Sequence, residues 1–101
     1  MNHFGEKIKE LREQKGLLQK HIASRLDIDT PMLSKIERGE RKAKREQVPI
    51  FAKELTIDKD DLLSLWLADQ IYNVVKDENM ALKAIRVAEE EIKYEINQKI
   101  K

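Results

Sequence analysis

The sequence lacks cysteine, long hydrophobic runs and strand-like alternation, and each absence excludes a class of structure. None of its 101 residues is a cysteine, which excludes disulfide bonds and thiolate chemistry. No apolar run approaches the ~20 residues that a helix needs to cross a bilayer, and the N-terminal residues form no apolar core of a secretory signal. No stretch alternates with the two-residue period of a strand. We therefore expect a soluble, cytoplasmic and helical protein.

Groupings of side chains that carry chemistry are also missing. The chain has no glycine-rich phosphate loop, no Ser/His/Asp set and no paired carboxylates that stand out. His3 and His21 are isolated from one another and from any cluster of His, Asp or Glu. The run Glu89-Glu90-Glu91 is typical of a solvated helix face. We expect no enzyme, no metal site and no cofactor.

Charge is distributed unevenly along the chain, although the net charge is only +1. Residues 1–57 carry thirteen Lys or Arg against nine Asp or Glu, and residues 58–101 carry seven against ten. Six basic side chains fall between Lys35 and Arg45, opposed by Glu37 and Glu40 alone. A local basic patch on a nearly neutral chain indicates either contact with a polyanion at one place or a solvated loop.

Apolar residues recur every three or four positions, which predicts helices throughout. Gly16 and Gly39 are typical helix stops, and Pro31 suits a first helical turn with Thr30 as its N-cap. Pro49 favours a late start or an irregular first turn for the helix that contains it. The expected helices cover about residues 4–15, 19–26, 30–38 and 47–55, then run from 59 after the cap Asp58 and from 78 after the cap Asp77.

The last two expected helices carry more apolar surface than one small core can bury. The segment LLSLWLADQIYNVV is apolar nearly all round, and the final helix has a one-sided apolar stripe. This excess predicts a twofold symmetric dimer, although the final helix could instead fold back on its own neighbour. The residues assigned to the dimer interface are Leu65, Trp66, Ile71, Val74, Ile85 and Ile92.

Two short helices joined by a three-residue turn match the helix-turn-helix plan, in which the second helix enters a groove about 12 Å wide. The stretch LREQKGLLQKHIASRLDIDTPMLSKIERGER resembles the lambda-repressor-like, Cro-type (XRE) helix-turn-helix family, and FAKELTIDKDDLL continues the resemblance to about residue 67. It implies an all-α, five-helix DNA-binding domain over residues 1–67. Residues 68–101 are then a C-terminal helical extension, to which the excess apolar surface assigns dimerisation. The matching positions are Gly16, Leu17, Gln19, Ile22, Ala23, Leu26, Ile28, Leu33, Ser34, Ile36, Glu37 and Gly39.

The resemblance also implies roles for single residues. Gln19 would hydrogen-bond a backbone phosphate of double-stranded DNA, with Lys20 nearby, and Lys35 would donate to guanine in the major groove. Arg12 and Glu37 stand where the family has a partly buried ion pair; the alternative is two unrelated surface charges. The outward positions of the recognition helix are Thr30, Pro31, Ser34 and Lys35, and the phosphate contacts are Arg38, Arg41, Lys42, Lys44 and Arg45.

Two residues depart from the family pattern. Leu18 replaces the usual serine or threonine cap of the second helix, which weakens that cap by about 1 kcal/mol. Pro31 stands where the family often has a polar base-reading side chain. Proline offers only apolar contact, so DNA shape gains importance in recognition.

The resemblance implies a homodimeric transcriptional regulator that binds a pseudo-palindromic operator, with recognition helices ~34 Å apart. The segment LWLADQIYNVVKDE is also similar to small controllers of restriction–modification systems, which regulate their own operons. A phage-type repressor is a close alternative. An antitoxin or a protein-interaction adaptor with the same fold would instead depend on a protein partner.

Overall fold

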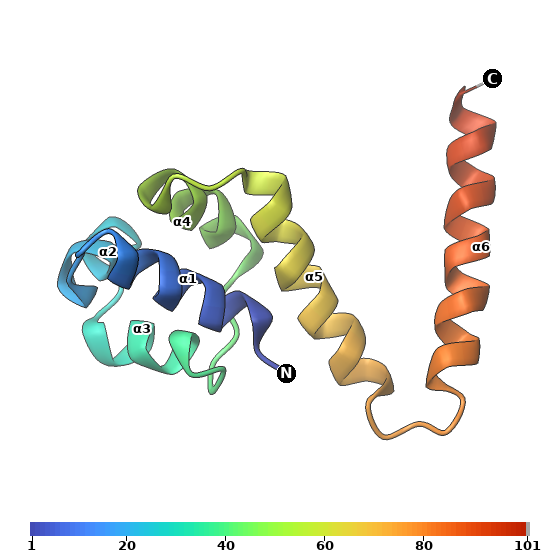
Figure 1. Ribbon diagram of the computed structural model, residues 1–101, viewed down its shortest axis with the longest axis horizontal. Coiled ribbons are helices and arrows are strands. Elements are labelled where there is room, and N and C mark those ends of the chain that lie inside the picture. The colour runs from blue at the N-terminus through green and yellow to red at the C-terminus, as the bar shows by residue number, and fades with distance from the viewer. Residues whose placement is uncertain (101) are drawn as a thin grey trace. The chain divides into compact units, whose positions relative to one another are not determined.

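Helices make up nearly all the regular structure of the computed structural model, which describes residues 1–100 (Figure 1). No strand occurs among these residues, so the predicted all-α class is confirmed. In chain order the elements are α1 (His3–Gln14), α2 (Gln19–Arg25), α3 (Thr30–Glu37), the 3-10 turn η1 (Arg45–Gln47), α4 (Val48–Leu55), α5 (Lys59–Val75) and α6 (Ala81–Ile100). None of the described helices is long and apolar enough to span a membrane.

The helix ends match most of the predicted boundaries and correct two caps. The irregular turn expected before Pro49 is confirmed, because η1 precedes α4 and Pro49 lies in the first turn of α4. The N-cap of α3 is Asp29 and not Thr30, since the Asp29 side chain accepts a hydrogen bond of 2.9 Å from the Met32 N–H. Asp77 caps no helix: it lies in the turn after α5, and α6 begins at Ala81.

Contacts divide the chain into two units, residues 1–71 and the residues from Tyr72 onward. The first unit has one hydrophobic core. Phe4 and Phe51 meet edge to face in it with ring centroids 5.6 Å apart, which is a favourable aromatic geometry. The buried apolar residues are Phe4, Ile8, Ile22, Ala23, Leu26, Leu33, Ile36, Ala43, Val48, Phe51, Ala52, Leu55, Leu62 and Trp66.

A glycine allows α1 and α3 to pack closely. A Cβ atom added to the buried Gly5 would lie 2.4 Å from the carbonyl oxygen of Ile36 and 2.5 Å from the Asn2 side chain. Real Cβ atoms do not approach backbone oxygens so closely, so the packing of α3 against the first turn of α1 depends on the missing side chain. This packing sets where α3 stands on the domain.

The N-terminus of α1 takes its caps from both near and far in the sequence. Asn2 accepts from the Gly5 N–H at 3.1 Å, and its amide donates to the Glu37 carbonyl oxygen at 2.9 Å. The Asp69 carboxylate on α5 accepts from the N–H groups of His3 at 3.0 Å and Phe4 at 2.9 Å. These bonds satisfy N–H groups that have no partner within α1, and they connect α1 to α3 and α5.

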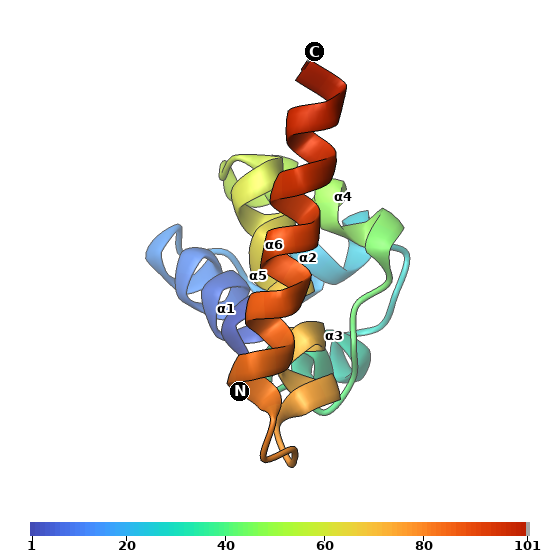
Figure 2. The ribbon, with the colours of Figure 1, turned by 90° about the vertical axis from the view of Figure 1, so that its right-hand side faces the viewer.

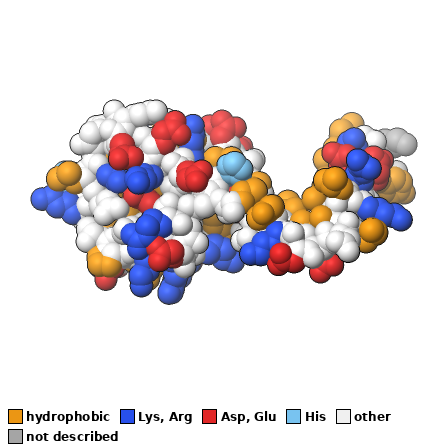
Figure 3. Space-filling model, turned by 60° about the horizontal axis from the view of Figure 1, so that its bottom comes forward, with side chains coloured by type: hydrophobic (Ala, Val, Ile, Leu, Met, Phe, Trp, Pro, Cys, Tyr) orange, Lys and Arg blue, Asp and Glu red, His pale blue; other side chains and the backbone are white. Residues whose placement is uncertain are grey.

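The second unit is largely exposed. α6 is one uninterrupted helix (Figure 2). It has 20 residues, and none of its side chains is buried. Its apolar stripe includes Ile92, which is 57% exposed, and hydrophobic side chains gather on the surface of this unit (Figure 3). Exposed apolar surface of this extent is typical of an interaction face.

Candidate nucleic-acid interface

Helices α2 and α3 are joined by a tight turn, residues 26–29. Asp27 has a left-handed backbone at φ 56°, which reverses the chain, and the half-buried Ile28 packs against the core. Ile22 and Ala23 of α2 and Leu33 of α3 are buried, so these short helices turn fixed faces inward. Their opposite faces are therefore held toward solvent in a fixed orientation.

The outward face of α3 carries the residues predicted to meet DNA bases. Thr30, Pro31 and Lys35 are exposed, and Ser34 is half-buried. Lys35 is the single long cationic side chain on α3, and it lies in the last turn of that helix. The exposed positions of the first turn hold only the short side chains of Thr30 and Pro31, so Lys35 is the exposed side chain of α3 that reaches furthest from the helix.

A segment rich in basic residues, Arg38–Arg45, follows α3. Gly39 has φ 77°, which suits glycine and turns the chain out of the helix. The N–H groups of Glu40 and Arg41 then both donate to the carbonyl oxygen of Lys35, at 2.9 and 3.3 Å. The segment's five basic side chains are all exposed: Arg38, Arg41, Lys42, Lys44 and Arg45.

Two of these five basic side chains have partners within the protein. The Arg38 guanidinium donates to the Glu40 carboxylate and to the Ser34 hydroxyl. The Lys42 ammonium lies 5.7 Å from the centroid of the Trp66 ring and 3.4 Å from the Gln70 side-chain oxygen. Both remain exposed to solvent.

Trp66 was assigned to the dimer interface, and in the structure its side chain is 8% exposed and packs in the core of its own unit. Its indole Nε1 donates a buried hydrogen bond of 2.8 Å to the Ala43 carbonyl oxygen. The indole N–H gains a partner there that an apolar interface would not provide, which explains the inward placement.

Arg12 and Glu37 meet in a bidentate pair at the base of the two short helices. The Arg12 Nε donates to Glu37 Oε2 at 2.7 Å, and Nη2 donates to Oε1 at 3.1 Å. The hydrogen bond with Glu37 raises the pKa of Arg12, against an opposing effect of burial. Arg12 Nη1 also donates to the Leu17 carbonyl oxygen at 3.0 Å, so the pair joins α1, the start of α2 and α3.

Gln19 belongs to the same network. Its amide donates to Glu37 Oε1 at 3.0 Å, which leaves a second amide hydrogen free for another acceptor such as a phosphate. The neighbouring Lys20 is exposed. Leu18 makes no side-chain hydrogen bond to α2, so the predicted loss of that cap is confirmed.

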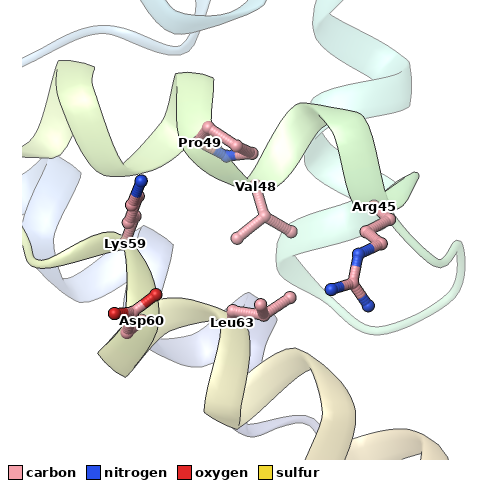
Figure 4. Close-up of a pocket in the computed structure, with 6 residues that line it drawn as sticks. All are labelled: Arg45, Val48, Pro49, Lys59, Asp60 and Leu63. Carbon is pink, nitrogen blue, oxygen red and sulfur yellow. The ribbon is translucent and has the colours of Figure 1, made fainter.

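A small hollow lies between the starts of α4 and α5 (Figure 4). Val48 and Leu63 face one another across it, and Arg45, Lys59 and Asp60 stand at its rim. The lining mixes apolar and charged side chains and includes no Ser, Thr, Cys or His. Within residues 1–100, no three His, Asp or Glu side chains gather closely enough to hold a metal ion.

The other side chains assigned to a dimer interface face solvent in part or in full. Leu65 is half-buried and borders a groove beside α1. Ile71, at the end of the first unit, is exposed. In the second unit Val74 is 78% exposed, and Ile85 and Ile92 are exposed as well.

Comparison with known protein families identifies a match. A family model described as a helix-turn-helix domain matches residues 5–66, which include most of α1, all of α2 to α4 and the first part of α5. No curated protein sequence shows significant similarity to the chain.

Proposed function

The chain belongs to the helix-turn-helix domain family, and we propose that it is a transcriptional regulator that binds a pseudo-palindromic operator as a homodimer. The observation that carries the proposal is the outward face of α3 together with the exposed basic segment that follows it. α3 supplies Lys35 to a guanine in the major groove. The basic segment supplies contacts to phosphates, which set affinity and register.

The dimer rests on the exposed apolar side chains at the end of α5 and along α6. Ile71, Val74, Ile85 and Ile92 offer apolar surface that a second copy would bury. A C2 dimer presents two recognition helices to successive major grooves, about 34 Å apart. Each subunit then places one Lys35 at its own half-site, so the dimer reads bases at two places and discriminates between sequences better than one subunit does.

We also propose that the regulator controls its own operon, as restriction–modification controllers do. The support is the similarity of the segment LWLADQIYNVVKDE to those proteins, and this segment lies in α5 and the turn after it. An adaptor or an antitoxin is the alternative. The exposed cations of the basic segment favour DNA, because a pure adaptor does not need them.

The test is binding of the purified full chain to the DNA upstream of its own gene, over a salt series and against random duplex. We expect tight, salt-sensitive binding at a pseudo-palindrome with two chains per site. Substitution of Lys35 and Arg38 by alanine should abolish operator binding and spare any protein partner. Binding equal to that on random DNA would exclude the autoregulator and turn the search to a protein partner.

A further inference from the structure

The backbone of the basic segment is attached to α5 at its centre. Trp66 Nε1 donates to the carbonyl oxygen of Ala43 at 2.8 Å, across 23 positions of sequence and out of contact with water. Ala43 is 1% exposed and Trp66 is 8% exposed. Because Ala43 stands between Lys42 and Lys44, this bond fixes the chain between two cations.

A second contact joins the same two elements. The Lys42 ammonium lies 5.7 Å from the centroid of the Trp66 ring, where the negative face of the indole attracts a cation. It also donates to the Gln70 side-chain oxygen at 3.4 Å, and the Gln70 amide donates to the Trp66 carbonyl at 3.4 Å. Lys42 is thus engaged with two side chains of α5.

The other anchors of the segment are local. Glu40 and Arg41 are bonded to Lys35, within one turn of the end of α3. At the far end the Lys44 N–H donates to the Gln47 side chain at 2.8 Å. The contacts with Trp66 and Gln70 are the long-range ones, and they hold the middle of a stretch that has neither helix nor strand between Glu40 and Lys44.

We propose that Trp66 is a positioning residue for DNA binding: it clamps Ala43 and Lys42 to α5, so that Arg41 and Lys44 meet backbone phosphates without first being ordered. Lys42 then acts as part of the clamp and not as a phosphate ligand. Ordering a loop before binding removes a cost of association. The inference rests on the proposed function, since it assigns to Trp66 the positioning of the side chains that contact DNA phosphates.

The clamp can be tested without DNA, because the segment contains trypsin sites after Arg41, Lys42 and Lys44. The chain has a single tryptophan, so a benzothienylalanine analogue supplied in its place changes position 66 alone. The analogue keeps the fused ring and replaces the N–H donor by sulfur. Trp66→Phe is the encoded counterpart. In both proteins we expect cleavage within the segment to rise severalfold over the native rate.

The same proteins are then compared on duplex DNA. We expect affinity to fall about tenfold on operator and random duplex alike, with the ratio between them unchanged.

Lys42→Met should leave the slope of log affinity against log salt unchanged, whereas Arg41→Ala should reduce it by about one. Ile8→Val serves as the control, because it weakens the core from α1 and should alter neither cleavage nor affinity well below its melting temperature.

Four results would decide against parts of this account. Native cleavage rates in the analogue would overturn the clamp. Faster cleavage with unchanged affinity would overturn its role in positioning, as would a reduced salt slope in Lys42→Met. A native protein that binds no DNA, with faster cleavage in the analogue, would remove the proposed function while the clamp contact itself stood.

Discussion

The carboxylate of Asp69 on α5 accepts a hydrogen bond of 2.9 Å from the backbone N–H of Phe4 in the first turn of α1. A helix usually receives its cap from a residue just before it, and Asn2 does serve α1 in that way. Asp69 adds a cap from 65 positions further along the chain. The negative carboxylate also lies at the positive end of the α1 dipole.

Asp69→Ala should destabilise the folded state by about 1–2 kcal/mol, because two N–H groups of α1 lose their acceptor. Urea unfolding should show a lower midpoint with an unchanged slope. Asp77→Ala is the matched control, because Asp77 lies exposed in the turn after α5. Equal midpoints for the two variants would contradict a capping role for Asp69.

Gly5→Ala should cost about 1–3 kcal/mol or prevent folding, because the new methyl group would meet the Ile36 carbonyl oxygen. Gly16→Ala provides the comparison. Gly16 has φ 66° with open space around it, so alanine there suffers only backbone strain of about 1–2 kcal/mol. Thermal melts of both variants should rank Gly5→Ala lower, and the reverse order would refute close packing of α1 on α3.

Removing one partner of the Arg12–Glu37 pair should destabilise more than removing both. Arg12→Met leaves the Glu37 carboxylate, whose side chain is 3% exposed, without its cation, at a cost of about 3–5 kcal/mol. Adding Glu37→Met should recover a large part of that loss. A double-mutant cycle by chemical denaturation measures the coupling, and strictly additive effects would show that the pair contributes nothing as a pair.

The pH dependence of this contribution follows from the raised pKa of Arg12. A base whose pKa is higher in the folded state stabilises that state fully below its unfolded pKa, and the contribution is lost as pH rises through the folded pKa. For a guanidinium that window is strongly alkaline. The destabilisation caused by Arg12→Met should therefore be constant between about pH 6 and 9, and unfolding experiments at three pH values in that range would check it.

Lys35→Ala and Arg41→Ala should weaken DNA binding in different ways. Without Lys35, preference for the base pair that it reads should fall by about 1–3 kcal/mol. Without Arg41, binding to all sequences should weaken equally and the salt slope should fall by about one. Competition binding with single-base variants of the operator separates the two. Uniform loss for Lys35→Ala would mean that Lys35 contacts phosphate instead.

Ile92→Glu should lower the affinity of dimerisation, because it places a charge on the apolar stripe of α6. Glu90→Gln is the control, since residues two apart on a helix lie on nearly opposite faces. Sedimentation equilibrium should show the first variant as monomer at concentrations where the native chain and the control are dimers. A native chain that is monomeric throughout would exclude the proposed dimer.

Local patterns in the sequence predicted the helices, including the two short helices of the helix-turn-helix motif. Leu33 and Ile36 at helical spacing are enough to set the buried face of α3, and the effect of Pro49 on its helix follows from its missing N–H. Caps were harder. Asp29 and Thr30 are neighbouring residues that both cap well, and only the backbone conformation decides between them.

The long-range polar contacts could not be predicted. Asp69 on α5 has no local signal that it meets the first turn of α1, since that depends on how the helices pack. Trp66 presented the same difficulty: an apolar run that is hydrophobic all round does not say which side faces the core. The acceptor for its indole N–H is the backbone carbonyl oxygen of Ala43. Every residue has such an oxygen, so the sequence gives no sign of which one is the partner.

α5 is one helix that both units share, because it runs from Lys59 to Val75 and the contacts divide after Ile71. Anyone who shortens the chain to isolate its N-terminal part therefore has no natural loop at which to cut. A chain that stopped at Ile71 would end in mid-helix and leave its final carbonyl groups without donors. Stopping after Lys76 would keep the last bond of the helix, in which the Lys76 N–H donates to the Tyr72 carbonyl at 2.8 Å.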